Sequence, residues 1–172
     1  SSDNTMQVCN KYKVKVINHP YSFGNGAAIK SGTRAATNDT IVFMDADGQH
    51  KAEDVNRLLL KLKDNYDMVV GARKSSTQAS FLRIIANKFY NKLAYYKTSY
   101  KIEDLTSGFR VVNRKKFMRF LYLLPNGFSY PTTSTMAFFR SGYSVAYIPI
   151  EAQQREGKSH IRLFKDGLKF FT

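Results

Sequence analysis

Two carboxylates, Asp45 and Asp47, follow an apolar run of strand type at residues 41–44. In a strand, residues i and i+2 point to the same side, so the turn after residue 44 can bring both carboxylates onto one cation. Hard divalent cations such as Mg²⁺ and Mn²⁺ prefer oxygen ligands, and the amide of Gln49 adds a third oxygen. Because open α/β sheets bind ligands at the carboxyl ends of their strands, this spacing predicts a metal site that would hold a diphosphate.

Two other interpretations apply to the same residues. Asp-Ala-Asp-Gly at residues 45–48 is typical of a turn, because Asp accepts hydrogen bonds from nearby backbone amides and Gly permits positive φ. The pattern also resembles the start of a calcium-binding loop, which needs Gly at position 6 and Glu at position 12. Counted from Asp45, those positions hold His50 and Asn56, so the calcium loop is excluded and the turn remains the alternative.

Further polar residues adjoin the other expected strands. Arg73 follows the apolar run at residues 66–71. In a parallel sheet it would lie near the acidic pair, where a guanidinium can bind phosphate through two hydrogen bonds. Residues 104–110 combine a carboxylate, two hydroxyls, a glycine and an arginine, a set that could bind a sugar and a phosphate together. The alternatives are a solvated surface arginine and a capped turn that enters a strand.

Two glycine-containing segments could also contact phosphates. Gly-Asn-Gly at residues 24–26 opens an expected helix, and its backbone amides could face an anion. The dinucleotide-binding pattern Gly-x-Gly-x-x-Gly is not met, since residue 29 is Ile, and a tight turn that needs glycine is the favoured interpretation. Residues 153–160 are polar and carry a glycine hinge. They could form a lid that brings Arg155 and Lys158 onto phosphates, or an exposed linker.

Composition narrows the classes of protein. The chain has 172 residues, 43% of them hydrophobic and 23% charged, as expected for one globular domain over residues 1–172. Its net charge of +14 would attract phosphates of nucleic acid, nucleotides or anionic lipid. The single cysteine, Cys9, excludes an internal disulfide and suits a reducing compartment. No apolar run reaches the roughly 18 residues of a membrane span, and the polar residues 1–10 are not a signal peptide.

The elements that would position these residues alternate between strands and helices. This alternation predicts an α/β fold with a mostly parallel sheet and helices on its faces. Residues 160–172 predict an amphipathic helix with one apolar and one basic face, suited either to a membrane interface or to packing on the core. The expected strands cover residues 13–18, 40–44, 66–71, 108–112 and 143–150, and the other expected helices cover residues 3–12, 24–36, 52–63, 81–96, 114–123 and 132–139.

Taken in order, these motifs resemble the inverting family 2 glycosyltransferases of GT-A fold. Among them the chain looks most like the polyprenyl-phosphate sugar transferases, the dolichyl-phosphate mannose synthase group. Each motif is modest alone, and their order and spacing make the resemblance specific. The resemblance implies a GT-A type, Rossmann-like sheet, and a chain that begins after the family's first strand, which carries Pro-x-x-Asn-Glu. The residues that carry the resemblance are 2–5, 24–32, 45–50, 71–73, 104–110 and 155–159.

The resemblance also implies roles for individual residues. The donor would be a nucleotide-diphosphate sugar, GDP- or UDP-linked. Asp45, Asp47 and Gln49 would hold Mg²⁺ or Mn²⁺ on its diphosphate, and Asp47, Arg73 and Arg110 would be catalytic. The residues expected to bind substrate, either on the donor or around the acceptor phosphate, are Gly26, Lys30, Asp104, Ser107, Gly108, Arg155, Lys158 and Ser159.

The expected acceptor follows from a residue type that is missing. A lipid phosphate is already ionised and can attack the anomeric carbon without losing a proton, whereas a hydroxyl acceptor normally needs a positioned base. Many family 2 members carry an acidic base in the stretch that residues 130–136 occupy here, yet this stretch has no acidic residue. We therefore expect a polyprenyl-phosphate acceptor, and a cytoplasmic protein peripheral to or anchored at a membrane surface.

Two alternatives remain. One is a glycosyltransferase that acts on a glycan hydroxyl. The other is a basic nucleic-acid-binding or membrane-binding module without activity. A nucleic-acid partner is not expected, because the acidic pair would repel phosphates unless a metal were bound.

Overall fold

The computed structural model describes residues 4–73, 102–127 and 129–151. The helices expected at residues 81–96 and 160–172, and the expected substrate residues Arg155, Lys158 and Ser159, lie outside the described residues.

The described residues form one mixed four-stranded sheet of order β1-β3-β2-β4. Its strands are β1 (Thr40–Phe43), β2 (Met68–Arg73), β3 (Arg110–Asn113) and β4 (Val145–Ile150). β3 is antiparallel to both β1 and β2, and β2 is parallel to β4. The expectation of a mostly parallel sheet therefore holds for the directions of β1, β2 and β4. The antiparallel insertion of β3 between β1 and β2 was not predicted.

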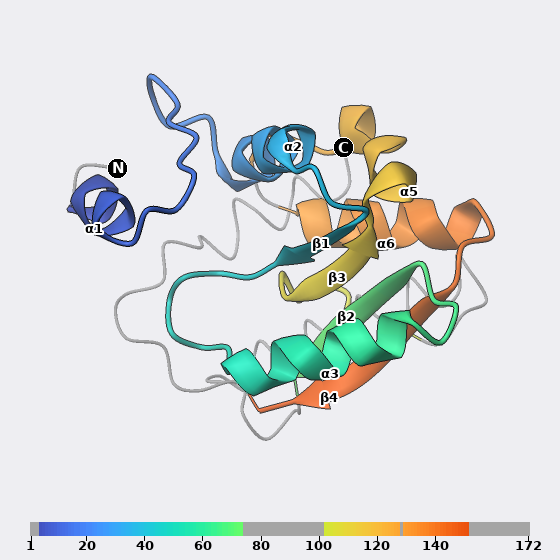
Figure 1. The fold of residues 1–172 in the computed structure, drawn as a ribbon. Helices are drawn as coiled ribbons and strands as arrows, with labels where there is room; N and C mark the ends of the chain where they lie inside the picture. Colours follow the sequence, from blue (N-terminus) through green and yellow to red (C-terminus); the bar gives the residue numbers. More distant parts are fainter. Residues whose placement is uncertain (1–3, 74–101, 128, 152–172) are drawn as a thin grey trace, which may run out of the picture.

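Helices cover both faces of this sheet, as predicted (Figure 1). Along β2, Met68 and Val70 pack with Phe138 of α6 (Tyr130–Arg140), and Val69 between them packs with Leu58 of α3 (Ala52–Leu62). This alternation is the two-residue period of a strand that is buried on both sides. It fixes which side chains of the neighbouring strands face each helix.

The remaining helices mostly match the sequence pattern. Helices α1 (Thr5–Lys11) and α2 (Asn25–Ala35) form where they were expected. The helix expected at residues 114–123 divides into α5 (Arg114–Met118) and a 3₁₀ turn, η2 (Leu121–Leu123). Asn113 caps α5 by accepting a hydrogen bond from the Lys116 amide. No helix within the described ranges is both long and apolar enough to cross a bilayer.

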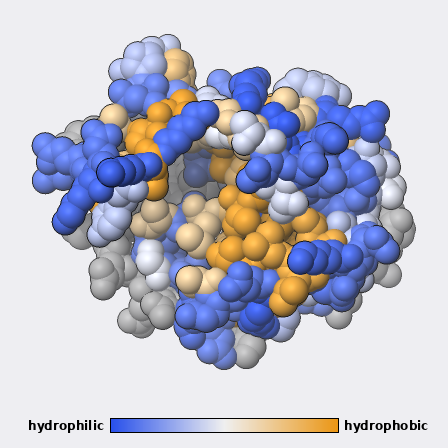
Figure 2. Space-filling model, in the orientation of Figure 1, coloured by the Kyte–Doolittle hydropathy of each residue, from blue (hydrophilic) through white to orange (hydrophobic). Residues whose placement is uncertain are grey.

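The strand expected at residues 13–18 does not form, and that prediction is wrong. No described strand lies beside this segment, and a strand needs a partner for its backbone groups. Val14 and Ile17 are exposed there, at 53% and 44%. Figure 2 shows the resulting apolar surface on the N-terminal segment, separate from the larger apolar area over the sheet and α3.

Candidate functional site

Three polar segments meet at one edge of the sheet because of the direction of β3. The register pairs Phe43, the last residue of β1, with Arg110, the first residue of β3, and pairs Arg110 also with Val70 in the middle of β2, so the last three residues of β2 lie beside the loop before β3. The loop before β3 therefore lies at the edge where β1 and β2 end. Residues 45–50, Arg73 and residues 104–109 converge there. From a parallel sheet the sequence predicted that Arg73 would lie near the acidic pair. The antiparallel β3 brings residues 104–109 to the same edge.

The turn at residues 45–50, called the acidic turn below, offers accessible oxygen atoms. Asp45 is exposed and Asp47 is half-buried. Asp47 Oδ1 accepts a hydrogen bond of 3.2 Å from the backbone N–H of Gln49. The loop is therefore an Asp turn, and the same loop carries the proposed metal ligands. The described part of the chain contains no group of three or more Asp, Glu, His or Cys side chains that could hold a metal. The donor set fits a hard divalent cation that takes its remaining oxygens from water or phosphate.

Asp45 lies against Gly108 and Tyr130. A Cβ atom added to Gly108 would lie 3.3 Å from Asp45 Oδ2 and 3.3 Å from the Tyr130 hydroxyl oxygen. That hydroxyl donates a hydrogen bond of 2.8 Å to the Gly108 carbonyl. Burial, together with the nearby Asp45 carboxylate, raises the pKa of Tyr130 to about 12, and the Arg110 charge only partly opposes this. Tyr130 is therefore a protonated donor, and no sequence pattern signalled its place here.

His50 closes the other end of the acidic turn. Its ring stacks on Phe109 with 4.6 Å between centroids and 23° between planes. Nδ1 of His50 is buried without a hydrogen-bond partner among the described residues. Burial lowers the pKa of His50 and Arg73 lowers it further, against the opposing charges of Asp45 and Asp47. The contacts of His50 are those of a packing residue within the site.

Arg73 and Asp104 were both expected to act on substrate, and in the structure they pair with each other. Arg73 Nε donates to Asp104 Oδ2 at 2.8 Å, and Arg73 Nη2 donates to Asp104 Oδ1 at 3.1 Å. Asp104 Oδ1 also accepts from the amides of Thr106 and Ser107, each at 3.1 Å. Burial alone would raise the pKa of Asp104, but the Arg73 hydrogen bonds and charge hold it below its usual range. Arg73 thus fixes the loop, while its side chain remains 30% exposed toward solvent.

The prediction that Arg110 contacts phosphate is corrected by its burial. The two-residue period of β3 points Arg110 toward α6, where it is fully buried. Its guanidinium donates to the Ser107 carbonyl, to the Pro131 carbonyl at 2.9 Å and to Ser134 Oγ at 2.9 Å. Ser107 is only 2% exposed, so its side chain is likewise not available as a substrate contact. Arg110 positions the loop before β3 and the start of α6.

The start of α2 is also occupied by the protein itself. The Gly26 amide donates to the Gly127 carbonyl at 3.1 Å. A Cβ on Gly26 would lie 1.9 Å from the Pro125 carbonyl oxygen, and Lys30 Nζ donates to the Leu124 carbonyl at 3.0 Å. The expected substrate roles of Gly26 and Lys30 are corrected accordingly. The favoured interpretation, a turn that needs glycine, is confirmed at Gly24, whose φ is +98°; at Gly26 glycine is needed for close packing, which the sequence did not indicate.

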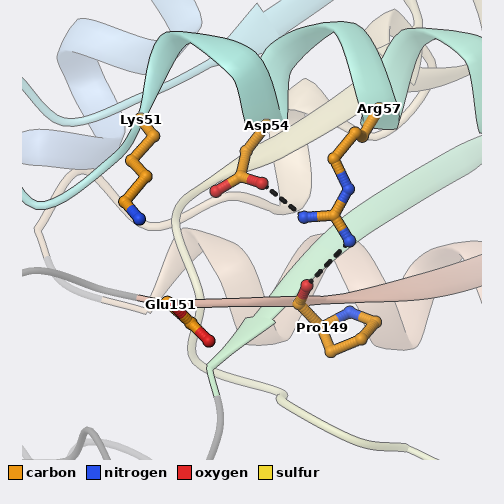
Figure 3. A pocket seen from close by; sticks show the side chains of 5 residues that line it. All are labelled: Lys51, Asp54, Arg57, Pro149 and Glu151. Atoms are coloured by element: carbon orange, nitrogen blue, oxygen red, sulfur yellow. Dashed lines mark hydrogen bonds and ion pairs between the residues drawn. The ribbon is translucent and has the colours of Figure 1, made fainter.

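A pocket of about 290 Å³ adjoins this edge between the start of α3 and the end of β4 (Figure 3). Arg57 donates to the Pro149 carbonyl at 3.2 Å and pairs with Asp54, which links α3 to β4. The charge of Asp54 also acts on His50, so pocket and acidic turn are neighbours. No motif in the sequence indicated this pocket. Its lining is Lys51, Asp54, Arg57, Pro149 and Glu151.

The chain is similar to known proteins in sequence and in fold. The model of the family described as "Glycosyl transferase family 2" matches residues 1–121. A dolichyl-phosphate hexose transferase of Haloferax volcanii is 25% identical over 97% of this chain and 73% of its own length. An uncharacterized glycosyltransferase of Synechocystis is 28% identical over 60% of this chain, a match that spans only 32% of the relative.

A solved structure shows the same fold. It is the glucosyl-3-phosphoglycerate synthase of Mycobacterium tuberculosis in complex with Mn²⁺, uridine-diphosphate-glucose and phosphoglyceric acid. It matches with a TM-score of 0.71 and 16% identity, over 98% of this chain and 60% of that one. At this identity the likeness shows the fold, which is the one expected from the sequence resemblance.

Proposed function

This chain belongs to glycosyl transferase family 2, and from that premise we propose that it transfers a hexose from a nucleotide-diphosphate sugar to a polyprenyl phosphate with inversion at the anomeric carbon. It is a glycosyltransferase of GT-A fold. The observation that carries the proposal is the convergence of the acidic turn, the Arg73–Asp104 pair and the loop before β3 at one sheet edge.

The acidic turn is proposed to bind the donor diphosphate. Asp45, Asp47 and Gln49 would hold Mg²⁺ or Mn²⁺, which when bound neutralises the charge that develops on the departing diphosphate. The catalytic role expected for Asp47 would then be to hold this cation. The synthase of the same fold binds Mn²⁺ with a UDP-linked sugar, which supports a nucleotide-sugar donor. We propose that this donor is linked to UDP or GDP.

The start of α6 supports an acceptor that needs no base. Ser134 and Thr135 are fully buried, and both accept hydrogen bonds from Arg110. Tyr130 is protonated and committed to the Gly108 carbonyl. None of these groups can remove a proton from a hydroxyl. An ionised phosphate oxygen can instead form the bond to the anomeric carbon while the bond to the donor diphosphate breaks.

The lipid part of the acceptor is inferred from a relative. The Haloferax protein that aligns with 97% of this chain is named as a dolichyl-phosphate hexose transferase. We extend the proposal to residues outside the described ranges: Arg155, Lys158 and Ser159 would close on phosphates, and residues 160–172 would contact the membrane surface. Residues 1–172 would then act as one catalytic domain at the cytoplasmic face of a membrane.

The test is an acceptor panel with the purified protein. GDP- and UDP-linked hexoses are each offered with undecaprenyl or dolichyl phosphate, with phosphoglyceric acid and with a glycan acceptor. We expect metal-dependent transfer to the lipid phosphates only, giving a product that releases sugar in mild acid. Transfer to the hydroxyl acceptors but not to lipid phosphate would overturn the proposed acceptor.

A further inference from the structure

The acidic turn rests on two consecutive residues of the loop before β3. At its first carboxylate, Asp45 Oδ2 lies 3.3 Å from the position that a Cβ at Gly108 would take. At its last residue, the His50 ring lies flat on Phe109. The two ends of the turn that carries Asp45, Asp47 and Gln49 therefore lie against two consecutive residues, Gly108 and Phe109.

Gly108 supplies room that no other residue type would leave. A Cβ at this position would come within 3.3 Å of both Asp45 Oδ2 and the Tyr130 hydroxyl oxygen. Contacts that short force a neighbour to move by a few tenths of an ångström. Tyr130 is held by its hydrogen bond to the Gly108 carbonyl and by the Arg110 guanidinium, 5.6 Å from its ring. Asp45, which is exposed, is the group that would move.

Phe109 supplies a rigid surface for His50. It is fully buried, and its carbonyl accepts a hydrogen bond of 2.9 Å from the Gly71 amide. A Cβ on Gly71 would lie 2.8 Å from the Phe109 ring, so β2 packs closely against that ring. His50 thus lies on a side chain fixed to the central strands of the sheet.

We propose that Gly108 and Phe109 are positioning residues that hold the acidic turn in its cation-binding conformation before the cation arrives, with Tyr130 fixing Gly108 and His50 as the contact on the turn. This inference rests on the proposed function, because it assigns these residues to the metal site. Residues that orient the ligands of a metal commonly change its affinity by about 10–100-fold when they are replaced.

The experiment measures Mn²⁺ binding rather than turnover. Electron paramagnetic resonance titrations, with Mn²⁺ alone and with Mn²⁺ plus UDP, are compared for the wild type, Gly108→Ala, His50→Ala, His50→Phe and Tyr130→Phe. Gly32→Ala is the matched glycine control, because a Cβ at Gly32 meets nothing within 4 Å. Thermal melting of each variant is recorded beside the titration.

We expect Gly108→Ala and His50→Ala to weaken Mn²⁺ binding at least about tenfold. His50→Phe restores binding because it keeps an aromatic ring on Phe109, and Tyr130→Phe gives a smaller loss. Gly32→Ala binds as the wild type does. A purely structural role would lower the melting temperature of Gly108→Ala and His50→Ala and leave their Mn²⁺ affinity unchanged, and that result overturns the positioning role.

Two further outcomes distinguish a failure of the proposed metal site from a failure of the positioning role. Absence of Mn²⁺ binding by the wild type, with and without UDP, overturns the proposed metal site and with it the positioning role. If Gly108→Ala does not fold, the comparison of His50→Ala with His50→Phe decides the matter. Equal affinities in that pair contradict the positioning role.

Discussion

Arg73 and Asp104 form a two-bond ion pair that joins the end of β2 to the loop before β3, with Nε–Oδ2 and Nη2–Oδ1 distances of 2.8 and 3.1 Å. Asp104 is 3% exposed, and it also accepts hydrogen bonds from the backbone amides of Thr106 and Ser107, which shape the loop. The pair therefore links two of the three segments that converge at the candidate site. Its contribution depends on Asp104 being ionised.

Acid should release this link. In the folded chain the pKa values of Asp104 and Asp67 lie below their usual range. Although burial opposes this for both, hydrogen bonds from Arg73 to Asp104, and from Lys116 and Ser144 to Asp67, outweigh it. The unfolded chain then takes up protons first, so both groups stabilise the fold above the ordinary aspartate pKa of about 3.9, and their contribution is lost as pH falls through the folded values.

Urea unfolding between pH 7 and pH 2 measures this effect. Asp104→Asn should lower the free energy of unfolding by about 3 kcal/mol at pH 7, because it breaks a largely buried pair. The same variant should show a shallower loss of stability below pH 4. An Asp104→Asn curve parallel to that of the wild type would contradict the assignment.

Replacing Arg110 distinguishes a positioning role from contact with substrate. Arg110→Lys keeps the positive charge but cannot reach the Ser107 and Pro131 carbonyls and the Ser134 hydroxyl together. We expect it to cost more than about 3 kcal/mol of stability, since buried acceptors lose their partners. Arg119→Lys, at an exposed arginine, should change stability by less than about 0.5 kcal/mol. Unchanged stability of Arg110→Lys with weakened donor binding would instead restore the catalytic role predicted from the sequence.

The sequence predicted local structure better than it predicted strand order. The helical period of Val55, Leu58 and Leu62 and the apolar run at residues 40–44 each lead directly to an element of the fold. The direction of β3 depends on which strands it pairs with, and its four residues carry no signal for that choice. The segment at residues 13–18 shows the same limit, because strand propensity without a neighbouring strand does not form a strand.

In the candidate site, too, the sequence predicted some features and missed others. That Arg73 lies near Asp45 and Asp47 was predicted, since these residues follow expected strands, whereas only the family resemblance implied a place for Asp104 in the site. The burial of Arg110 and the close packing of Gly26 were not predicted, because they depend on which face of a strand or helix meets another segment. The contacts of Asp45 with Gly108 and of His50 with Phe109 join residues far apart in the sequence, and no spacing rule reveals them.

Two glycines of α2 should respond oppositely to the same substitution. Gly26→Ala places a Cβ 1.9 Å from the Pro125 carbonyl oxygen, a backbone atom with little freedom to move, and we expect a loss of about 3 kcal/mol. Gly32→Ala meets nothing within 4 Å and should gain up to about 1 kcal/mol, because Ala favours the helix. Urea unfolding of both variants measures the difference. Equal effects would show that α2 does not pack on residues 125–127 in solution.

Removing the charge of the acidic turn tests its proposed ligand role directly. Asp45→Asn and Asp47→Asn keep the side-chain shape, yet a neutral amide is a much weaker ligand for a hard cation than a carboxylate. Calorimetry should show the Mn²⁺-dependent affinity for UDP or GDP falling at least about tenfold in each, with little change in binding measured in EDTA. Glu53→Gln is the control, since it removes one exposed negative charge from the first turn of α3 and should leave the affinity unchanged. If both Asp variants keep the wild-type metal-dependent affinity, the turn is a structural Asp turn and the diphosphate binds elsewhere.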